Sequence, residues 1–66
     1  MEITLNGEKH AVKEAGSILD LLHSLGVDPE KVAVELDRQI VRTPLWGSTL
    51  VGAGAQVEIV HFVGGG

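Results

Sequence analysis

A single helical stripe of apolar residues, placed among segments that alternate in polarity, constrains the fold of this chain most. The stripe has the i, i+3, i+4, i+7 spacing of one face of an α-helix. It consists of Ile18, Leu21, Leu22 and Leu25. This face must be covered by other apolar residues, and the sequence has no second amphipathic helix to cover it. The helix is therefore expected to pack on one face of a β-sheet.

Segments with the two-residue alternation of half-buried strands flank the helix on both sides. Ile3 and Leu5 mark the first strand, and Asn6-Gly7 predicts a tight hairpin turn because both residues tolerate a positive φ. The strands that are predicted to follow cover residues 9–13, 32–36, 39–41 and 57–63. The order of two strands, a helix and three strands predicts a small α+β fold of two layers.

Local signals mark the ends of these elements. Ser17 is predicted to cap the helix, with Asp20 three residues later completing a capping box, and Gly26 is predicted to end it. Asp37-Arg38 is predicted to turn the chain between two strands.

The segment after residue 41 is expected to contain a single helical turn. Thr43 is predicted as its N-cap and Pro44 as its first residue. Trp46, the only tryptophan, either closes the edge of the core or anchors a partner, and small domains more often use it in the core. Leu50-Val51 is expected to add a short apolar anchor.

Size and composition exclude several classes of protein. The chain has 66 residues, which suffice for one small domain but not for a large catalytic cavity. It has no cysteine, which excludes disulfides and thiolate chemistry and fits a reducing cytoplasm. Its formal net charge of -4 disfavours nucleic acid and favours a protein partner with a basic groove. No export signal or membrane-spanning run is present, so a cytoplasmic protein without a membrane partner is expected.

The body of the chain offers little that resembles an active site. Its histidines, His10, His23 and His61, lie on different predicted elements and lack the paired spacing of a metal site. The serines lack the context of an activated nucleophile, and no glycine-rich loop opens a helix to hold a phosphate. Residues 1–63 are therefore expected to form a scaffold with no catalytic residue and no bound metal or cofactor.

Three glycines, Gly64, Gly65 and Gly66, follow the most β-prone segment directly. Residues 64–66 are predicted to form a flexible tail, which is thin enough to enter a narrow channel of another protein. The reactive group of such a tail is the α-carboxylate of Gly66, which is ionised at neutral pH. This carboxylate can attack the α-phosphate of ATP to give a mixed anhydride whose carbonyl then accepts sulfur. The alternative is a disordered or engineered glycine end.

The last predicted strand leads into this tail and has an uncovered face. Val57 and Ile59 are expected to point toward the helix. Glu58, Val60 and Phe62 then point to the opposite face of the sheet, which no second helix covers. Exposed apolar side chains beside the tail predict a docking patch for partner proteins.

Five segments carry a resemblance to a known family. They are residues 3–7, residues 17–22, residues 32–37, residues 39–42 followed by Trp46, and residues 57–66. In this order they resemble the ThiS-type sulfur carriers of thiamine biosynthesis, which are small ubiquitin-like proteins. The resemblance implies the β-grasp fold, an α+β fold with a mixed sheet of four to five strands and one helix on one face. It also implies that the first and last strands pair in parallel at the centre of the sheet.

The resemblance further implies a carrier rather than an enzyme. In the family, an E1-like adenylyltransferase uses ATP to adenylate the C-terminal glycine. Sulfur supplied by a cysteine desulfurase then converts this glycine to a thiocarboxylate, from which thiazole synthase takes the sulfur. By position, Gly66 would carry the thiocarboxylate, and the face with Val60 and Phe62 would dock the partners.

Two alternatives stay open at this point. One is a carrier of the same fold that serves molybdopterin or cysteine synthesis. The other is an interaction module of the β-grasp type that uses its sheet face and not its tail.

Overall fold

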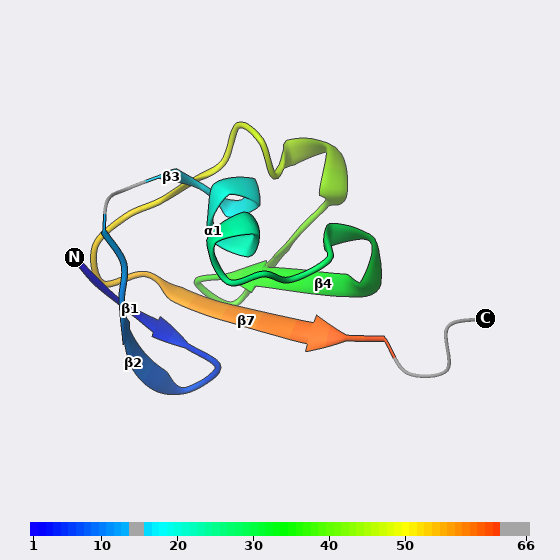
Figure 1. Cartoon of the computed structure of the whole chain (residues 1–66). Helices are drawn as coiled ribbons and strands as arrows, with labels where there is room; N and C mark the ends of the chain where they lie inside the picture. The colour runs from blue at the N-terminus through cyan, green and yellow to red at the C-terminus, as the bar shows by residue number, and fades with distance from the viewer. Residues whose placement is uncertain (14–15, 63–66) are drawn as a thin grey trace.

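The computed structural model describes residues 1–13 and 16–62, which form a sheet with a helix on one of its faces (Figure 1). The strands are β1 (Glu2–Leu5), β2 (Glu8–Ala11), β3 (Gly16–Ser17), β4 (Val32–Leu36), β5 (Gln39–Val41), β6 (Leu50–Val51) and β7 (Gln56–His61). The helix is α1 (Ile18–Ser24), and short 3-10 turns form η1 (Pro29–Lys31) and η2 (Thr43–Leu45).

The described residues contain a five-stranded sheet in the order β2-β1-β7-β4-β5 and a small two-stranded sheet of β3 and β6. β7 is the central strand. It pairs in parallel with β1 and antiparallel with β4, and each of these neighbours pairs antiparallel with the strand at its own edge. α1 crosses one face of this sheet (Figure 1). The predicted α+β architecture, with its parallel first and last strands, is confirmed.

The core lies between α1 and the sheet. Ile18, Leu21 and Leu22 of the predicted stripe are buried, and Leu25 is partly buried against them. The buried apolar residues from other elements are Ile3, Val32, Val34, Trp46, Val51, Ala55, Val57 and Ile59. The face of the five-stranded sheet that points away from α1, called the open sheet face below, has no other element of the described residues packed on it (Figure 1).

The ends of α1 have the predicted chemistry. The Ser17 hydroxyl accepts from the backbone N–H of Asp20, and the Asp20 carboxylate accepts from the backbone N–H of Ser17. At the other end Gly26 adopts a φ of 71°, and the N–H of Val27 donates to the carbonyl of Leu22 at 3.0 Å. These contacts satisfy backbone groups that the short helix leaves without partners of its own.

Both predicted hairpin turns are confirmed. Asn6 and Gly7 have φ values of 49° and 82°, and Asp37 and Arg38 have 49° and 71°. Two consecutive positive φ values give the type I′ turn, whose twist matches that of the flanking strands.

Three predictions of element boundaries were wrong. The second strand covers Glu8–Ala11 rather than 9–13, because the two-residue turn places Glu8 directly opposite Leu5. The last strand covers Gln56–His61, and position 63 lies outside the described residues. The N-cap of η2 is Arg42 rather than Thr43, and no side chain caps this turn.

The sequence pattern also missed the small second sheet. Leu50-Val51, predicted as an apolar anchor, forms β6 and pairs with β3. Val51 is buried as an anchor requires, whereas Leu50 is 72% exposed.

Trp46 belongs to the core. Its side chain is only 2% exposed, and its indole N–H donates to the carbonyl of Val41 at 2.8 Å. Its own carbonyl accepts from the N–H of Leu19 at 3.2 Å. The residue therefore joins η2 to both β5 and α1 and is not available to anchor a partner.

Candidate functional site

The predicted docking patch lies on the open sheet face at the outgoing end of β7. Val57 and Ile59 are buried under α1, whereas Glu58 is exposed. Val60 is 53% exposed and Phe62 is 61% exposed. The alternation along β7 thus places two large apolar side chains in solvent, as predicted.

Ile40 extends this apolar surface across the sheet, and sequence reasoning missed it. It lies opposite Glu35 in the β4–β5 pair and is 76% exposed. Ala33 lies between the two parts, directly opposite Val60 on β7 and diagonal to Ile40 on β5. Ala33, Ile40, Val60 and Phe62 are called the open-face patch below.

An acidic pair adjoins the open-face patch. Glu35 and Glu58 lie directly opposite each other on β4 and β7, and both point to the open sheet face. Like charges in directly opposed positions destabilise a sheet. Glu35 and Glu58 line a hollow of about 270 Å³ together with Arg38 and Gln56. The open sheet face thus combines apolar contact area with negative charge.

A second hollow, of about 510 Å³, opens between β2 and α1. Asp20 lines it, but its carboxylate is already engaged in the capping box. The hydrogen bond from the backbone N–H of Ser17 is the main reason that the pKa of Asp20 lies below its usual range. The Ser17 side chain and nearby His23 lower this pKa further. This aspartate therefore stabilises the helix and is a poor acid–base catalyst.

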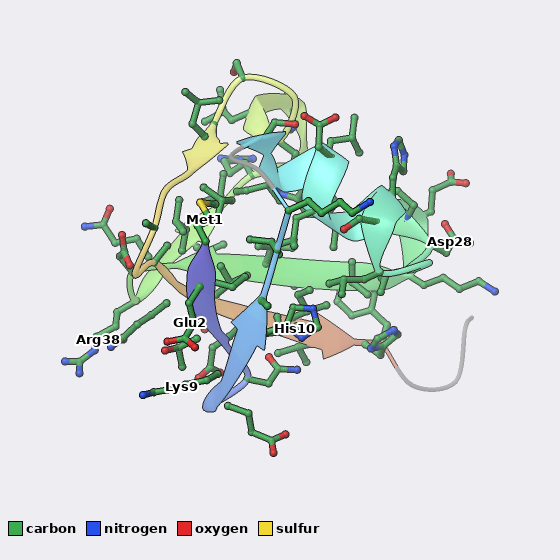
Figure 2. All side chains as sticks on the ribbon, turned by 60° about the vertical axis from the view of Figure 1, so that its left-hand side comes forward. Met1, Glu2, Lys9, His10, Asp28 and Arg38 are labelled. Carbon is green, nitrogen blue, oxygen red and sulfur yellow. The ribbon has the colours of Figure 1, made fainter. Side chains whose placement is uncertain are left out.

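The remaining charged side chains are dispersed. Glu2 and Lys9 project from the β1–β2 hairpin, Arg38 from the turn after β4, and Asp28 from the far end of the molecule (Figure 2). In the described part of the chain no three His, Asp or Glu side chains converge as metal ligands would. No described helix has the length and apolar character needed to cross a membrane. The predicted cytoplasmic location stays a prediction.

Two turn residues hold β7 in a way that sequence reasoning missed. The Asn6 side chain forms two hydrogen bonds with the backbone of Ile59, at 2.8 and 3.3 Å. The Asp37 carboxylate accepts from the N–H of Gln56 at 2.9 Å. Both residues were predicted as turn formers from their tolerance of positive φ, and this preference gives no sign of a partner 19 or 53 residues away.

The predicted tail, Gly64 to Gly66, and the predicted boundary after residue 63 lie outside the described residues. The structure describes the surface of the residues that come just before position 63 in the chain. The open-face patch ends at Phe62, immediately before this segment.

A central parallel β1–β7 pair, an antiparallel strand at each edge and a helix across one face define a ubiquitin-like β-grasp protein. The model of the ThiS family matches residues 1–66, and the chain belongs to this family. The crystal structure of a thiamine biosynthesis protein (ThiS) from Geobacter metallireducens has the same fold, with a TM-score of 0.88 and 35% sequence identity. The alignment covers 100% of each chain.

Two curated relatives are larger proteins named thiazole synthase. The protein from Magnetococcus marinus is 48% identical over 67 residues, and that from Paramagnetospirillum magneticum is 39% identical over 66 residues. Both alignments cover 100% of this chain but only 20% of the relative, so the chain spans about a fifth of their length.

Proposed function

We propose that this chain is a sulfur carrier of thiamine biosynthesis and not itself an enzyme. The observation that carries the proposal is membership of the ThiS family over residues 1–66. The two relatives named thiazole synthase each contain a segment similar to the whole chain, which supports thiazole formation as the receiving reaction. A carrier of the same fold that serves molybdopterin or cysteine synthesis would share the tail and differ in the enzyme that receives the sulfur.

In the proposed cycle the reactive group is the C-terminal carboxylate of Gly66. One of its oxygens attacks the α-phosphorus of ATP, which is bound by an E1-like adenylyltransferase, and pyrophosphate leaves. The terminal sulfur of a persulfide that a cysteine desulfurase supplies then attacks the carbonyl of the acyl adenylate, and AMP leaves. A thiol cleaves the S–S bond of the resulting acyl disulfide, which forms a disulfide with that thiol and releases Gly66 as a thiocarboxylate. Thiazole synthase takes the sulfur from this thiocarboxylate. Gly64 and Gly65 have no Cβ atom, which suits this end of the chain to a narrow active-site channel of a partner.

The open-face patch and Glu58 are proposed as the surface that docks these partners. Val60 lies on the central strand β7 and Phe62 follows its last residue, yet both are more than half exposed, so their apolar area is available for contact. The acidic pair of Glu35 and Glu58 favours partners that present basic groups opposite it. The ATP belongs to the activating enzyme, and no cofactor is proposed for this chain.

The test is the intact mass of the chain after incubation with ATP, an E1-like adenylyltransferase and a sulfide source. We expect a mass increase equal to the replacement of one oxygen by sulfur, located on the peptide that ends in Gly66. The matched control is the chain without Gly65 and Gly66, which should keep its fold and show no increase. An unmodified wild-type chain, with an adenylyltransferase active on another carrier, would contradict the proposal.

A further inference from the structure

The parallel pairing of β1 with β7 is short, and a side chain continues it. The N–H of Thr4 donates to the carbonyl of Ala55 at 2.9 Å, and the N–H of Asn6 donates to the carbonyl of Val57 at 2.9 Å. The next step of two residues along β7 reaches Ile59. Its N–H donates to Asn6 Oδ1 at 2.8 Å, and its carbonyl accepts from Asn6 Nδ2 at 3.3 Å.

The side chain of Asn6 takes the place of a backbone that has turned away. At Asn6 the chain enters the hairpin turn with a φ of 49°, and it returns as β2 on the far side of β1. No further backbone group of β1 is therefore available to Ile59. A carboxamide combines an NH₂ donor group with a C=O acceptor, and so it can pair with both the N–H and the C=O of Ile59 as a peptide backbone would.

This step lies at the start of the surface that is proposed to dock partners. Val60 follows Ile59 directly, and Phe62 is the last described residue. On its other side β7 is paired with β4 up to His61, and the N–H of Phe62 donates to the carbonyl of Lys31 at 2.9 Å. Among the hydrogen bonds that the described residues make from the β1 side, those of the Asn6 side chain lie nearest the outgoing end of β7, so they couple this end of the strand to β1.

We infer that Asn6 is a positioning residue for the carrier reaction, an inference that rests on the proposed function. It holds the outgoing half of β7 from the β1 side, and so it keeps Val60 and Phe62 in the orientation that a partner recognises. Its role is distinct from that of Asp37, which makes the corresponding side-chain contact at Gln56, at the incoming end of β7.

The test compares Asn6→Gly with Asp37→Gly. Both residues have a φ of 49° in a type I′ turn, where glycine is well tolerated, so both variants should fold. Asn6→Gly loses two side-chain hydrogen bonds to β7 and Asp37→Gly loses one, at opposite ends of the strand. The readouts are the amide exchange rate of Ile59 relative to that of Val60, and the dependence of ATP–pyrophosphate exchange by the E1-like adenylyltransferase on carrier concentration.

We expect Asn6→Gly to accelerate the exchange of Ile59 relative to Val60 by roughly five- to tenfold, the equivalent of one hydrogen bond. It should raise the half-saturating carrier concentration by roughly three- to tenfold, because Val60 and Phe62 are then held less rigidly and partner binding must restrict their motion. The maximal rate should be unchanged. Asp37→Gly should change neither quantity, although it lowers the melting temperature to a similar extent.

Equal effects of the two variants on half-saturation, or an Ile59 amide that stays protected in Asn6→Gly, would overturn the inference. If the wild-type chain itself supports no pyrophosphate exchange, the proposed function fails and the positioning role fails with it. The two failures are therefore distinguished by the wild-type measurement alone.

Discussion

Replacing Phe62 by serine removes the largest exposed side chain of the open-face patch without adding a charge. Full burial of an apolar side chain of this size stabilises by about 1.5–3 kcal/mol. Since Phe62 is 61% exposed, the part that is already covered contributes about 1 kcal/mol or less to folding. The exposed part offers about 1–2 kcal/mol to a partner that covers it. Phe62→Ser should therefore weaken partner binding by about 5- to 30-fold, with only a small loss of stability.

Leu50→Ser is the matched control. Leu50 is also apolar and is 72% exposed, but it lies on β6, outside the five-stranded sheet. Its substitution should cost little stability and leave partner binding unchanged.

The two measurements are calorimetric titration of each variant with the adenylyltransferase and urea unfolding of each variant alone. Trp46 is buried and is the only tryptophan, so its fluorescence reports the loss of the core directly. A loss of more than about 3 kcal/mol of unfolding free energy in Phe62→Ser would place this residue in the core. Equal binding by Phe62→Ser and Leu50→Ser would refute the assignment of the docking surface.

Three further predictions concern the helix cap and the acidic pair. Ser17→Ala should lower the free energy of unfolding by about 1 kcal/mol in urea titrations, because the N–H of Asp20 loses its acceptor; an unchanged midpoint would contradict this. The folded state lowers the pKa of Asp20, so the charged carboxylate stabilises the fold above the usual aspartate pKa, and this contribution is lost as the pH falls through the lowered value. The stability advantage of the wild type over Asp20→Asn should thus disappear in acid, and an advantage that is constant across urea titrations from neutral to acidic pH would exclude this role. Glu58→Gln should raise the unfolding free energy by about 0.2–1 kcal/mol at low salt and by less at high salt, because it removes the repulsion with Glu35; scanning calorimetry at two salt concentrations tests this, and a destabilised variant would argue against it.

The parts of the fold that depend on local chemistry could be predicted from the sequence. The two turns, the capping box and the glycine after α1 each depend on the dihedral and hydrogen-bonding preferences of a few neighbouring residues. The exposed face of β7 follows from its two-residue alternation once one face is known to be buried. The β3–β6 pair could not be predicted, because strands of two residues are too short to show a pattern.

Only those residues of the candidate site that follow from a local pattern could be predicted from the sequence. Val60 and Phe62 follow from alternation, but Ile40 joins them only because β5 pairs with β4 in the register that sets Ile40 opposite Glu35. The acidic pair could not be predicted either, because it also depends on the register of two strands. Glu35 and Glu58 are 23 positions apart in the chain, and only the register of β4 with β7 makes them neighbours.

The sequence by itself determined which segments become strands of the five-stranded sheet, where the helix begins and ends, and which face of the last strand stays in solvent. These properties arise from the backbone preferences of single residues and from the periodicity of apolar side chains, both of which act over a few positions. Only the tertiary structure decided that Trp46 is core and that the amide of Asn6 extends the ladder to Ile59. Such contacts join residues far apart in the chain, and they exist because packing of the apolar stripe of α1 on the sheet selects one strand order and one register.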